Sequence, residues 1–191
     1  MSIGTTTSFI MPFSVNIDPD TGVMENAENH LIRNASDMKG YYANENALQK
    51  IINKGNDPLH YEVFEVPVPE EYGHLSYCIS KLQPGIIGDE FFMTKGHYHT
   101  VVQTAEIYYC LRGKGYMMMK TADGKCVAEK MERGRMVYVP PFWAHRSINT
   151  GNEPLISFCV YPGDAGHNYG DIVTEGFPKR IFHKNNSVVI E

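Results

Sequence analysis

The sequence predicts a mostly β protein built as an antiparallel sandwich or barrel. From residue 60 onward, short segments rich in Val, Ile, Tyr and Phe alternate with Gly and Pro. The clearest of these segments span residues 60–68, 75–82, 105–113, 115–122, 135–141 and 154–162. Turn-forming sequences separate them, such as ADG at 122–124, ERG at 132–134 and NTGNEP at 149–154. Short strands at regular spacing, with turn residues between them, are typical of all-β sandwiches and barrels.

Residues 36–56 carry the best helical pattern in the chain. One stripe of 3.6-residue period contains Ala43, Ala47, Leu48, Ile51 and Ile52. Ser36 is a candidate N-terminal cap, and Gly55 is a candidate stop. No repeat or long linker divides the sequence, so we expect a single domain over residues 1–191. Its barrel core is expected at about 60–165, between a short helical and extended N-terminal extension (1–59) and a C-terminal tail (166–191).

Composition and charge exclude several classes of function. Seventeen basic and 22 acidic side chains give a net charge of −5, which argues against a nucleic-acid coat protein. No stretch approaches the length of an apolar membrane span, and the N-terminal MSIGTTTSFIMPF lacks the basic region of a secretory signal. The four cysteines form no CxxC pair, which favours free thiols in a reducing compartment. We therefore expect a soluble cytoplasmic protein with neither nucleic acid nor membrane as a partner.

Three histidines and one glutamate form a candidate metal site. His97 and His99 stand at i and i+2, so on an extended strand both imidazoles point to the same face. Glu106 opens the next strand, and His145 follows a turn-like PPFWA sequence. Three imidazoles and a carboxylate suit Fe(II), Mn(II), Ni(II), Zn(II) or Cu(II) and leave positions for a substrate. Taken singly, the histidines could instead serve in packing or at the surface, and Glu106 could be a solvated edge residue.

Two local patterns refine this picture. From Glu106 to Leu111, alternation predicts Glu106, Tyr108 and Cys110 on one side of a strand and Ile107, Tyr109 and Leu111 on the other.

The GKG sequence at 113–115 is interpreted as a hairpin turn and not as a nucleotide site, because the chain has no GxGxxG or Walker loop.

The site residues also match the two motifs of the cupin family. The first motif is His97, His99, Glu106 and Gly113, and the second is Gly134, Pro140, His145 and Asn149. Phe91 and Phe142 stand where most cupins have glycine, and the spacer before Glu106 is long. These departures fit a subgroup, because longer strings resemble the cupin-type glucose-6-phosphate isomerases described from archaea. The strings are ENA, SDMKGYY, GDEFFMTKGHYHT, AEIYYCLRGKG, VYVPPFWAHRSINTG and YPGDAGHNYGDI, and the resemblance runs from about residue 15 to about residue 183.

This resemblance implies a double-stranded β-helix (jelly-roll barrel), a homodimer and a sugar-phosphate substrate. It implies one divalent metal ion, with Fe(II) expected first and Mn(II), Ni(II) or Zn(II) as alternatives, held by His97, His99, Glu106 and His145. The implied activity is the interconversion of glucose 6-phosphate and fructose 6-phosphate, with Glu106 as the catalytic base. The resemblance assigns the phosphate to Thr94, Gly96 and Ser80, and the sugar to Tyr61, Tyr108, Tyr161 and His167.

Three other functions remain open on the sequence. A cupin dioxygenase would use the same metal ligands to bind O₂, and a sugar-phosphate sensor would bind without turnover. Mannose 6-phosphate differs from glucose 6-phosphate only at C2, so it is a further candidate substrate. The sequence does not choose between proton transfer through a cis-enediolate and a hydride shift from C2 to C1.

Overall fold

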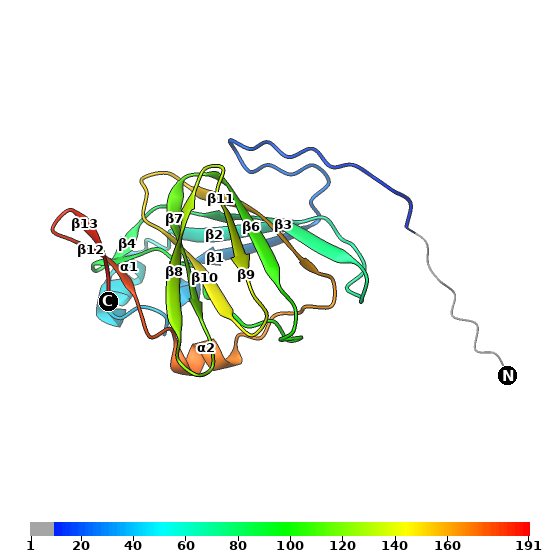
Figure 1. Cartoon of the computed structure of the whole chain (residues 1–191). Helices are drawn as coiled ribbons and strands as arrows, with labels where there is room; N and C mark the ends of the chain where they lie inside the picture. The colour runs from blue at the N-terminus through cyan, green and yellow to red at the C-terminus, as the bar shows by residue number, and fades with distance from the viewer. Residues whose placement is uncertain (1–9) are drawn as a thin grey trace.

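Two antiparallel sheets face each other in the computed structural model, which describes residues 10–191 (Figure 1). The larger sheet has the strand order β1 (Asn29–Asn34), β2 (Leu59–Glu65), β3 (Leu75–Leu82), β11 (Leu155–Pro162), β6 (Glu106–Arg112), β9 (Met136–Val139). The smaller has the order β10 (Ala144–Asn149), β7 (Lys114–Lys120), β8 (Cys126–Glu132). The predicted mostly β class with a jelly-roll arrangement is confirmed.

The remaining elements lie at one side of this barrel and below it (Figure 1). A four-stranded sheet has the order β13 (Ser187–Ile190), β12 (Ile181–Lys184), β5 (Glu90–Phe91), β4 (Ile86–Ile87). The helices are the 3₁₀ turn η1 (Ala35–Met38), α1 (Glu45–Asn53) and α2 (Gly170–Glu175). No helix within residues 10–191 is long and apolar enough to cross a membrane. The interpretation of the N-terminus as no secretory signal rests partly on residues 1–9, outside the described range.

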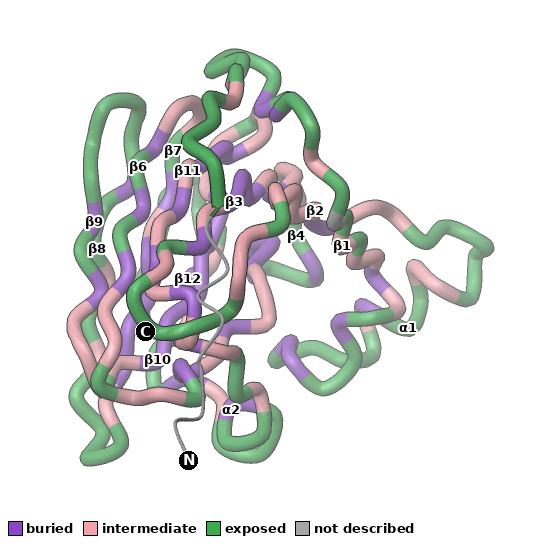
Figure 2. The backbone as a smooth tube through the Cα atoms, turned by 90° about the vertical axis from the view of Figure 1, so that its right-hand side faces the viewer, coloured by how far each residue is buried: buried purple, intermediate pink, exposed green. Residues whose placement is uncertain are grey.

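Burial follows the two-sheet arrangement, with buried and exposed residues alternating along the outer strands (Figure 2). In β6, Glu106, Tyr108 and Cys110 are buried while Ile107 and Tyr109 are exposed, which confirms the predicted alternation. The centre of the larger sheet is buried on both faces, because the segment around residues 15–27 covers its outside. Met24 from that segment packs with Ile79 and Ile156 in a small second core. The inner face of the larger sheet is thereby left to line the barrel interior.

The predicted helix exists but begins later than its stripe suggests. Asn44 caps α1, because its side chain accepts a hydrogen bond from the backbone N–H of Ala47 at 3.0 Å. The prediction that Ser36 is a cap is wrong, since its hydroxyl donates to Asp57 at 2.8 Å. Ala43 precedes the helix. Gly55 follows the last turn with a φ of +74°, as expected for a stop.

The interpretation of GKG as a hairpin turn is wrong. β6 pairs with β11 and β9, whereas β7 pairs with β10 and β8, so the chain passes from one sheet to the other at Gly113. Gly113 has a φ of +83°, and a Cβ there would lie 2.5 Å from the carbonyl oxygen of Pro154. The true hairpin is the ADG turn between β7 and β8, where the N–H of Thr121 donates to the carbonyl of Lys125 at 3.0 Å.

Candidate metal centre

Both sheets contribute to the histidine–glutamate cluster. His97 lies in the extended stretch after β5 and exchanges two backbone hydrogen bonds with His145, the second residue of β10. Glu106 is the first residue of β6, in the opposite sheet. His99 is two residues beyond His97, so its imidazole turns toward the same point.

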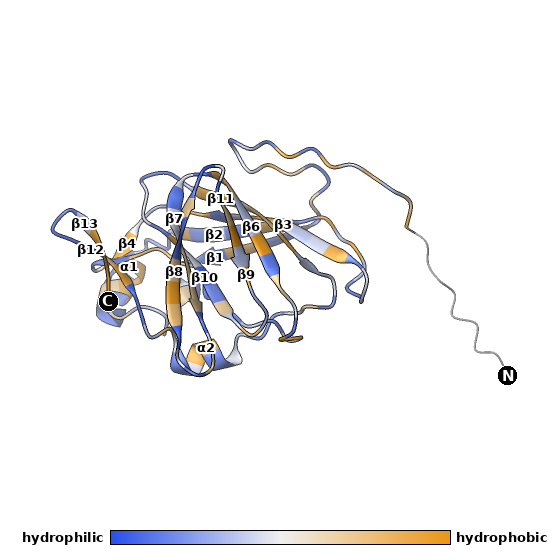
Figure 3. Ribbon diagram, viewed as in Figure 1, coloured by the Kyte–Doolittle hydropathy of each residue, from blue (hydrophilic) through white to orange (hydrophobic). Residues whose placement is uncertain are grey.

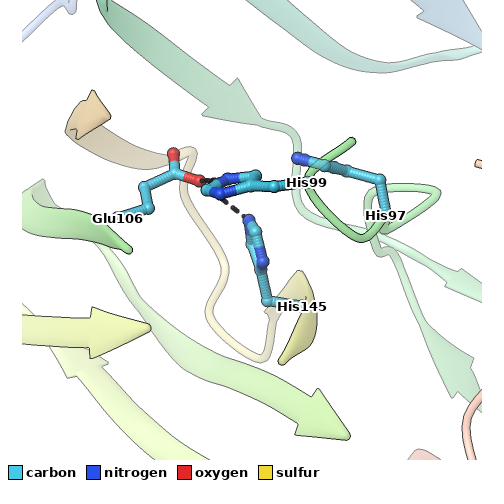
Figure 4. A group of neighbouring side chains, drawn as sticks. All are labelled: His97, His99, Glu106 and His145. Carbon is cyan, nitrogen blue, oxygen red and sulfur yellow. Dashed lines mark hydrogen bonds and ion pairs between the residues drawn. The ribbon is translucent and has the colours of Figure 1, made fainter. Parts of the chain in front are cut away.

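The four side chains meet inside the barrel (Figure 4). One candidate ligand atom from each lies within 4.8 Å of the others. Oε2 of Glu106 is 3.1 Å from Nε2 of His99 and 2.9 Å from Nε2 of His145. His99, Glu106 and His145 are buried, and His97 is partly buried. Bulk water therefore has little access to these charges.

The hydrogen bonds of His99 show that a positively charged partner is missing between its ring and the Glu106 carboxylate. The hydroxyl of Thr104 donates its only hydrogen to the carbonyl of Val101 at 2.6 Å. Its oxygen must therefore accept from Nδ1–H of His99 at 2.7 Å. In the neutral imidazole, Nε2 is then an acceptor, and it faces another acceptor, the carboxylate of Glu106. Two acceptors at this distance require either a second proton on His99 or a cation.

Unpartnered nitrogens in the same place favour a cation. Nε2 of His97 and both ring nitrogens of His145 are buried without a hydrogen-bond partner among the described residues. Nε2 of His145 lies 2.9 Å from Oε2 of Glu106, but this contact does not have the angles of a hydrogen bond. Buried polar atoms without partners are costly, and three imidazoles with one carboxylate are a common ligand set for divalent metals. The residues present thus fit a metal ion.

The electrostatics of the cluster keep the carboxylate ionised. Burial alone would raise the pKa of Glu106, but the neighbouring imidazoles of His145 and His99 outweigh it and hold the pKa well below its usual range. Burial, with further contributions from His145 and His167, lowers the pKa of His97 well below its ordinary value. An ionised Glu106 carboxylate and a neutral His97 imidazole are the protonation states that bind metal.

A cavity of about 280 Å³ opens beside the cluster. Of the residues predicted for the site, all except His99 line it: Tyr61, Ser80, Thr94, Gly96, His97, Glu106, Tyr108, His145, Tyr161 and His167. His99 lies behind Glu106 and contacts its carboxylate. The structure therefore brings together side chains that are up to about a hundred residues apart in the chain.

One part of the cavity wall is formed by hydroxyls and a glycine. Thr94 accepts a hydrogen bond from the N–H of Ser147 at 3.0 Å, so its hydroxyl hydrogen can point elsewhere. Ser80 lies on β3, in the facing sheet. Gly96 has a φ of +79°, and a Cβ there would lie 3.0 Å from Arg146, from the carbonyl of His145 and from Phe177. Its N–H donates to no atom of residues 10–191, which leaves it available to an anion.

Aromatic rings form another part of the wall. The His167 ring lies 4.5 Å from that of His97 and stacks on Tyr169 at 6.2 Å. Tyr161 donates a hydrogen bond to Glu65 at 2.9 Å, and its ring meets His167 edge-on. Burial raises the pKa values of Tyr108 and Tyr161, so both phenols are neutral donors at neutral pH.

Sequence reasoning missed Glu65, Ser147 and Tyr169, which also line the cavity. Glu65 accepts a hydrogen bond from Tyr161, which is 96 residues away, and no local pattern signals that contact. Tyr169 is two residues from His167, so the short loop that carries the predicted histidine could have indicated it.

The barrel and its buried histidine–glutamate cluster together define a cupin. A family model described as "Glucose-6-phosphate isomerase (GPI)" matches residues 32–190, and the chain belongs to this family. Glucose-6-phosphate isomerase from Thermococcus litoralis is 47% identical over 94% of both chains. The enzyme from Pyrococcus furiosus is 44% identical, again over 94% of both. The family membership implied by the sequence strings is confirmed.

Solved structures resemble part of the chain. A structure of Bacillus subtilis oxalate decarboxylase covers 55% of this chain and 26% of its own, with 23% identity and a TM-score of 0.45. At that level of likeness, nothing follows about the activity of the present chain.

Proposed function

We propose that this protein is a metal-dependent glucose-6-phosphate isomerase that interconverts glucose 6-phosphate and fructose 6-phosphate. The observation that carries the proposal is one cavity with two different chemistries in its wall. A buried cluster able to hold a metal ion forms one part, and hydroxyls with an unpartnered backbone N–H form another. A substrate that pairs a carbonyl-bearing sugar with a phosphate matches both, and family membership supports that choice.

His97, His99, Glu106 and His145 would hold one divalent ion, for which we expect Fe(II) first and Mn(II), Ni(II) or Zn(II) as alternatives. When bound, such an ion supplies Lewis acidity that stabilises negative charge developing on the sugar oxygens. The protein itself holds the four ligand atoms close together in a site of low water content. The metal would be bound by the carboxylate in its ionised form and by the imidazoles in their neutral form.

Glu106 is the proposed base that takes the proton from C2 and returns it to C1. Both contacts of its carboxylate to imidazoles use Oε2, so Oε1 is the oxygen that we expect to face the substrate. Its depressed pKa makes it a weak base, and a hydride shift from C2 to C1 is the competing route. Tyr108, Tyr161 and His167 would bind the sugar hydroxyls, together with Tyr61.

The phosphate would be held by the hydroxyls of Ser80 and Thr94 and by the backbone N–H of Gly96. Support comes from the free orientation of the Thr94 hydroxyl and from the unpartnered N–H of Gly96. Glycine at this position allows the backbone to approach an anion closely. The protein would act as a homodimer in the cytoplasm.

The test is a coupled isomerase assay on protein stripped of metal and then loaded with each ion under anaerobic conditions. We expect turnover of fructose 6-phosphate without oxygen uptake, and faster turnover of glucose 6-phosphate than of mannose 6-phosphate. Oxygen-dependent turnover would favour a dioxygenase instead. Substrate binding with no turnover under any metal would favour a sensor.

The role of Glu106 has its own test. We expect Glu106→Gln to lower turnover by roughly a hundredfold or more, because it removes the proton acceptor. Metal content must be measured on the same sample, since the substitution also removes a ligand charge. A variant that keeps both its metal and a near-wild-type rate rules out Glu106 as the base.

A further inference from the structure

Three cations gather around Tyr41, and within residues 10–191 none of them forms an ion pair with a carboxylate. Nζ of Lys95 lies 5.4 Å above the Tyr41 ring. Arg146 donates to the backbone carbonyl of Lys95 at 3.0 Å. The charges of Arg146 and Arg33 both act on the Tyr41 phenol, so all three cations are near neighbours of this ring.

Elsewhere, cations of comparable burial have carboxylate partners. Lys120 pairs with Glu175 at 3.0 Å, and Arg180 pairs with Glu90 at 2.8 Å. Within residues 10–191, no such pair forms at Arg33, Lys95 or Arg146. The Arg146 guanidinium, which is buried, lies over the ring of Phe177 at 4.2 Å. An unpaired buried charge is costly, so this cluster is an exception that requires an explanation.

Hydrogen-bond donors in the cluster are also left over. Nε of Arg33 and Nε of Arg146 are both buried without a partner in the described chain. The Arg33 guanidinium donates a hydrogen bond to the carbonyl of its own neighbour, Ile32, at 3.2 Å. Asp37 is the acid that acts on Lys95, and its carboxylate already accepts the backbone N–H of Asn34 at 2.9 Å. Cationic donors without acceptors are what an anion-binding site presents.

The cluster borders the cavity at its hydroxyl-bearing wall. Arg33 stands opposite Tyr61 in the β1–β2 ladder, on the same face as Leu31, and both Tyr61 and Leu31 line the cavity. Lys95 lies between Thr94 and Gly96, which line it as well. The positive charge therefore lies beside the proposed phosphate position.

We propose that Arg33 and Lys95 bind the substrate's phosphate directly and select phosphorylated over unphosphorylated hexoses, while Arg146 holds the 94–96 loop from behind. This inference rests on the proposed function, because it assigns the ligand of the same cavity. It also explains how a protein with a net charge of −5 attracts a dianion. A local excess of three positive charges next to the residues of the cavity wall dominates the potential there, since distant surface acids are screened by salt.

The test measures equilibrium binding, independently of turnover. Inorganic phosphate and glucose 6-phosphate are titrated by calorimetry into the full-length, metal-loaded wild-type protein and into Arg33→Gln and Lys95→Gln. Arg133→Gln is the matched control, because it removes the same charge from an exposed ion pair with Asp20. Each cluster variant should bind both ligands roughly ten- to a hundredfold more weakly, as loss of a charge-assisted contact predicts, and the control should bind within about twofold of wild type.

Circular dichroism establishes that each variant is folded, and Arg33→Lys should recover part of the lost affinity. Glucose without phosphate should bind equally to wild type and variants. The inference is overturned if both cluster variants bind phosphate as wild type does, if the control loses as much, or if the wild-type protein binds no phosphate. Failure of the proposed function is a separate outcome. If phosphate binding depends on Arg33 and Lys95 but the protein shows no isomerase turnover, the phosphate site is supported and the isomerase activity is contradicted.

Discussion

At the scale of single residues, the hydroxyl of Thr104 decides which nitrogen of His99 faces Glu106. Its oxygen accepts a hydrogen bond from Nδ1–H of His99, and its own O–H donates to the backbone carbonyl of Val101. Nε2 of the neutral His99 ring therefore carries no hydrogen. We predict that Thr104→Val lowers metal affinity roughly 10- to 100-fold while the barrel stays folded, because the ring loses its orienting partner. Competition with a coloured chelator measures this. Thr104→Ser, which keeps the hydroxyl, is the control, and equal affinity in Thr104→Val would contradict the assignment.

The buried ring of His60 makes the stability of the protein depend on pH. It stacks on Phe92 at 3.7 Å, and its Nε2 meets the hydroxyl of Tyr42 at 2.9 Å. Burial lowers its pKa from 6.5 to about 4, because the charged ring would lose its hydration. The unfolded chain therefore takes up a proton between these two values while the native protein does not. Stability contributed by the neutral ring is complete above pH 6.5 and is lost as the pH falls toward about 4.

The pH dependence can be measured by urea unfolding of the wild-type protein and of His60→Gln. The free energy of unfolding of the wild type should fall by roughly 2 kcal/mol more than that of the variant between about pH 7 and about pH 4.5. The difference between the two proteins isolates His60 from the other groups that titrate in this range. Parallel pH profiles would show that the ring is not held neutral in the native state.

At the level of the secondary-structure elements, Gly113 lies where the chain crosses from one sheet to the other. Comparison with Gly124, a glycine in a hairpin turn, distinguishes the steric requirement of this crossing from that of an ordinary turn. Gly113 and Gly124 have φ values of +83° and +90°, so alanine is strained at either position. Only at Gly113 would the added Cβ meet backbone, 2.5 Å from the carbonyl of Pro154, while Gly124 faces open space. We predict that Gly113→Ala costs about 1–3 kcal/mol more stability than Gly124→Ala in denaturant titrations. Equal costs would mean that the sheet crossing tolerates a side chain.

The same corner shows why local sequence predicts strands better than their pairing. β3 and β6 are found within a residue or two of their expected positions, because alternation and flanking turn residues are local signals. β10 is missed because all six of its residues, AHRSIN, are buried, so it shows no alternation. GKG has the composition of a turn in either case. Whether it closes a hairpin or crosses between sheets depends on Pro154, which is distant in sequence.

The candidate site shows the same difference between what local sequence signals predict and what long-range contacts determine. His97, His99, Glu106 and His145 could be predicted because their spacing matches a family motif. Glu65 could not, since its place in the cavity wall and its hydrogen bond to Tyr161 arise from long-range contacts that no local motif signals. Arg33 lies in a strand that was not predicted, and the register between β1 and β2 is what brings it beside Tyr61.

At the scale of the whole molecule, one apolar surface on the larger sheet remains uncovered. Ile107 and Tyr138 are cross-strand partners on β6 and β9, and so are Tyr109 and Met136. All four side chains are exposed, with Met136 and Tyr138 more than half accessible. Figure 3 shows hydrophobic stretches on β6 and also on β8, the outer strand of the smaller sheet. A contiguous exposed apolar patch of this kind marks an interaction surface, and a second copy of the chain is the occupant that the proposed homodimer requires.

Paired substitutions test this dimer surface directly. Light scattering after size-exclusion chromatography should give the wild-type protein twice the 21.6 kDa mass of one chain. Ile107→Lys with Tyr138→Lys places two charges in the apolar patch, where a dimer interface would have to bury them, so the mass should move toward 21.6 kDa as protein concentration is lowered. Val173→Lys is the control, because Val173 is an equally exposed apolar residue on α2, outside the patch. A monomeric wild type would remove the dimer from the proposal, and a double variant that stays dimeric would place the interface on another face.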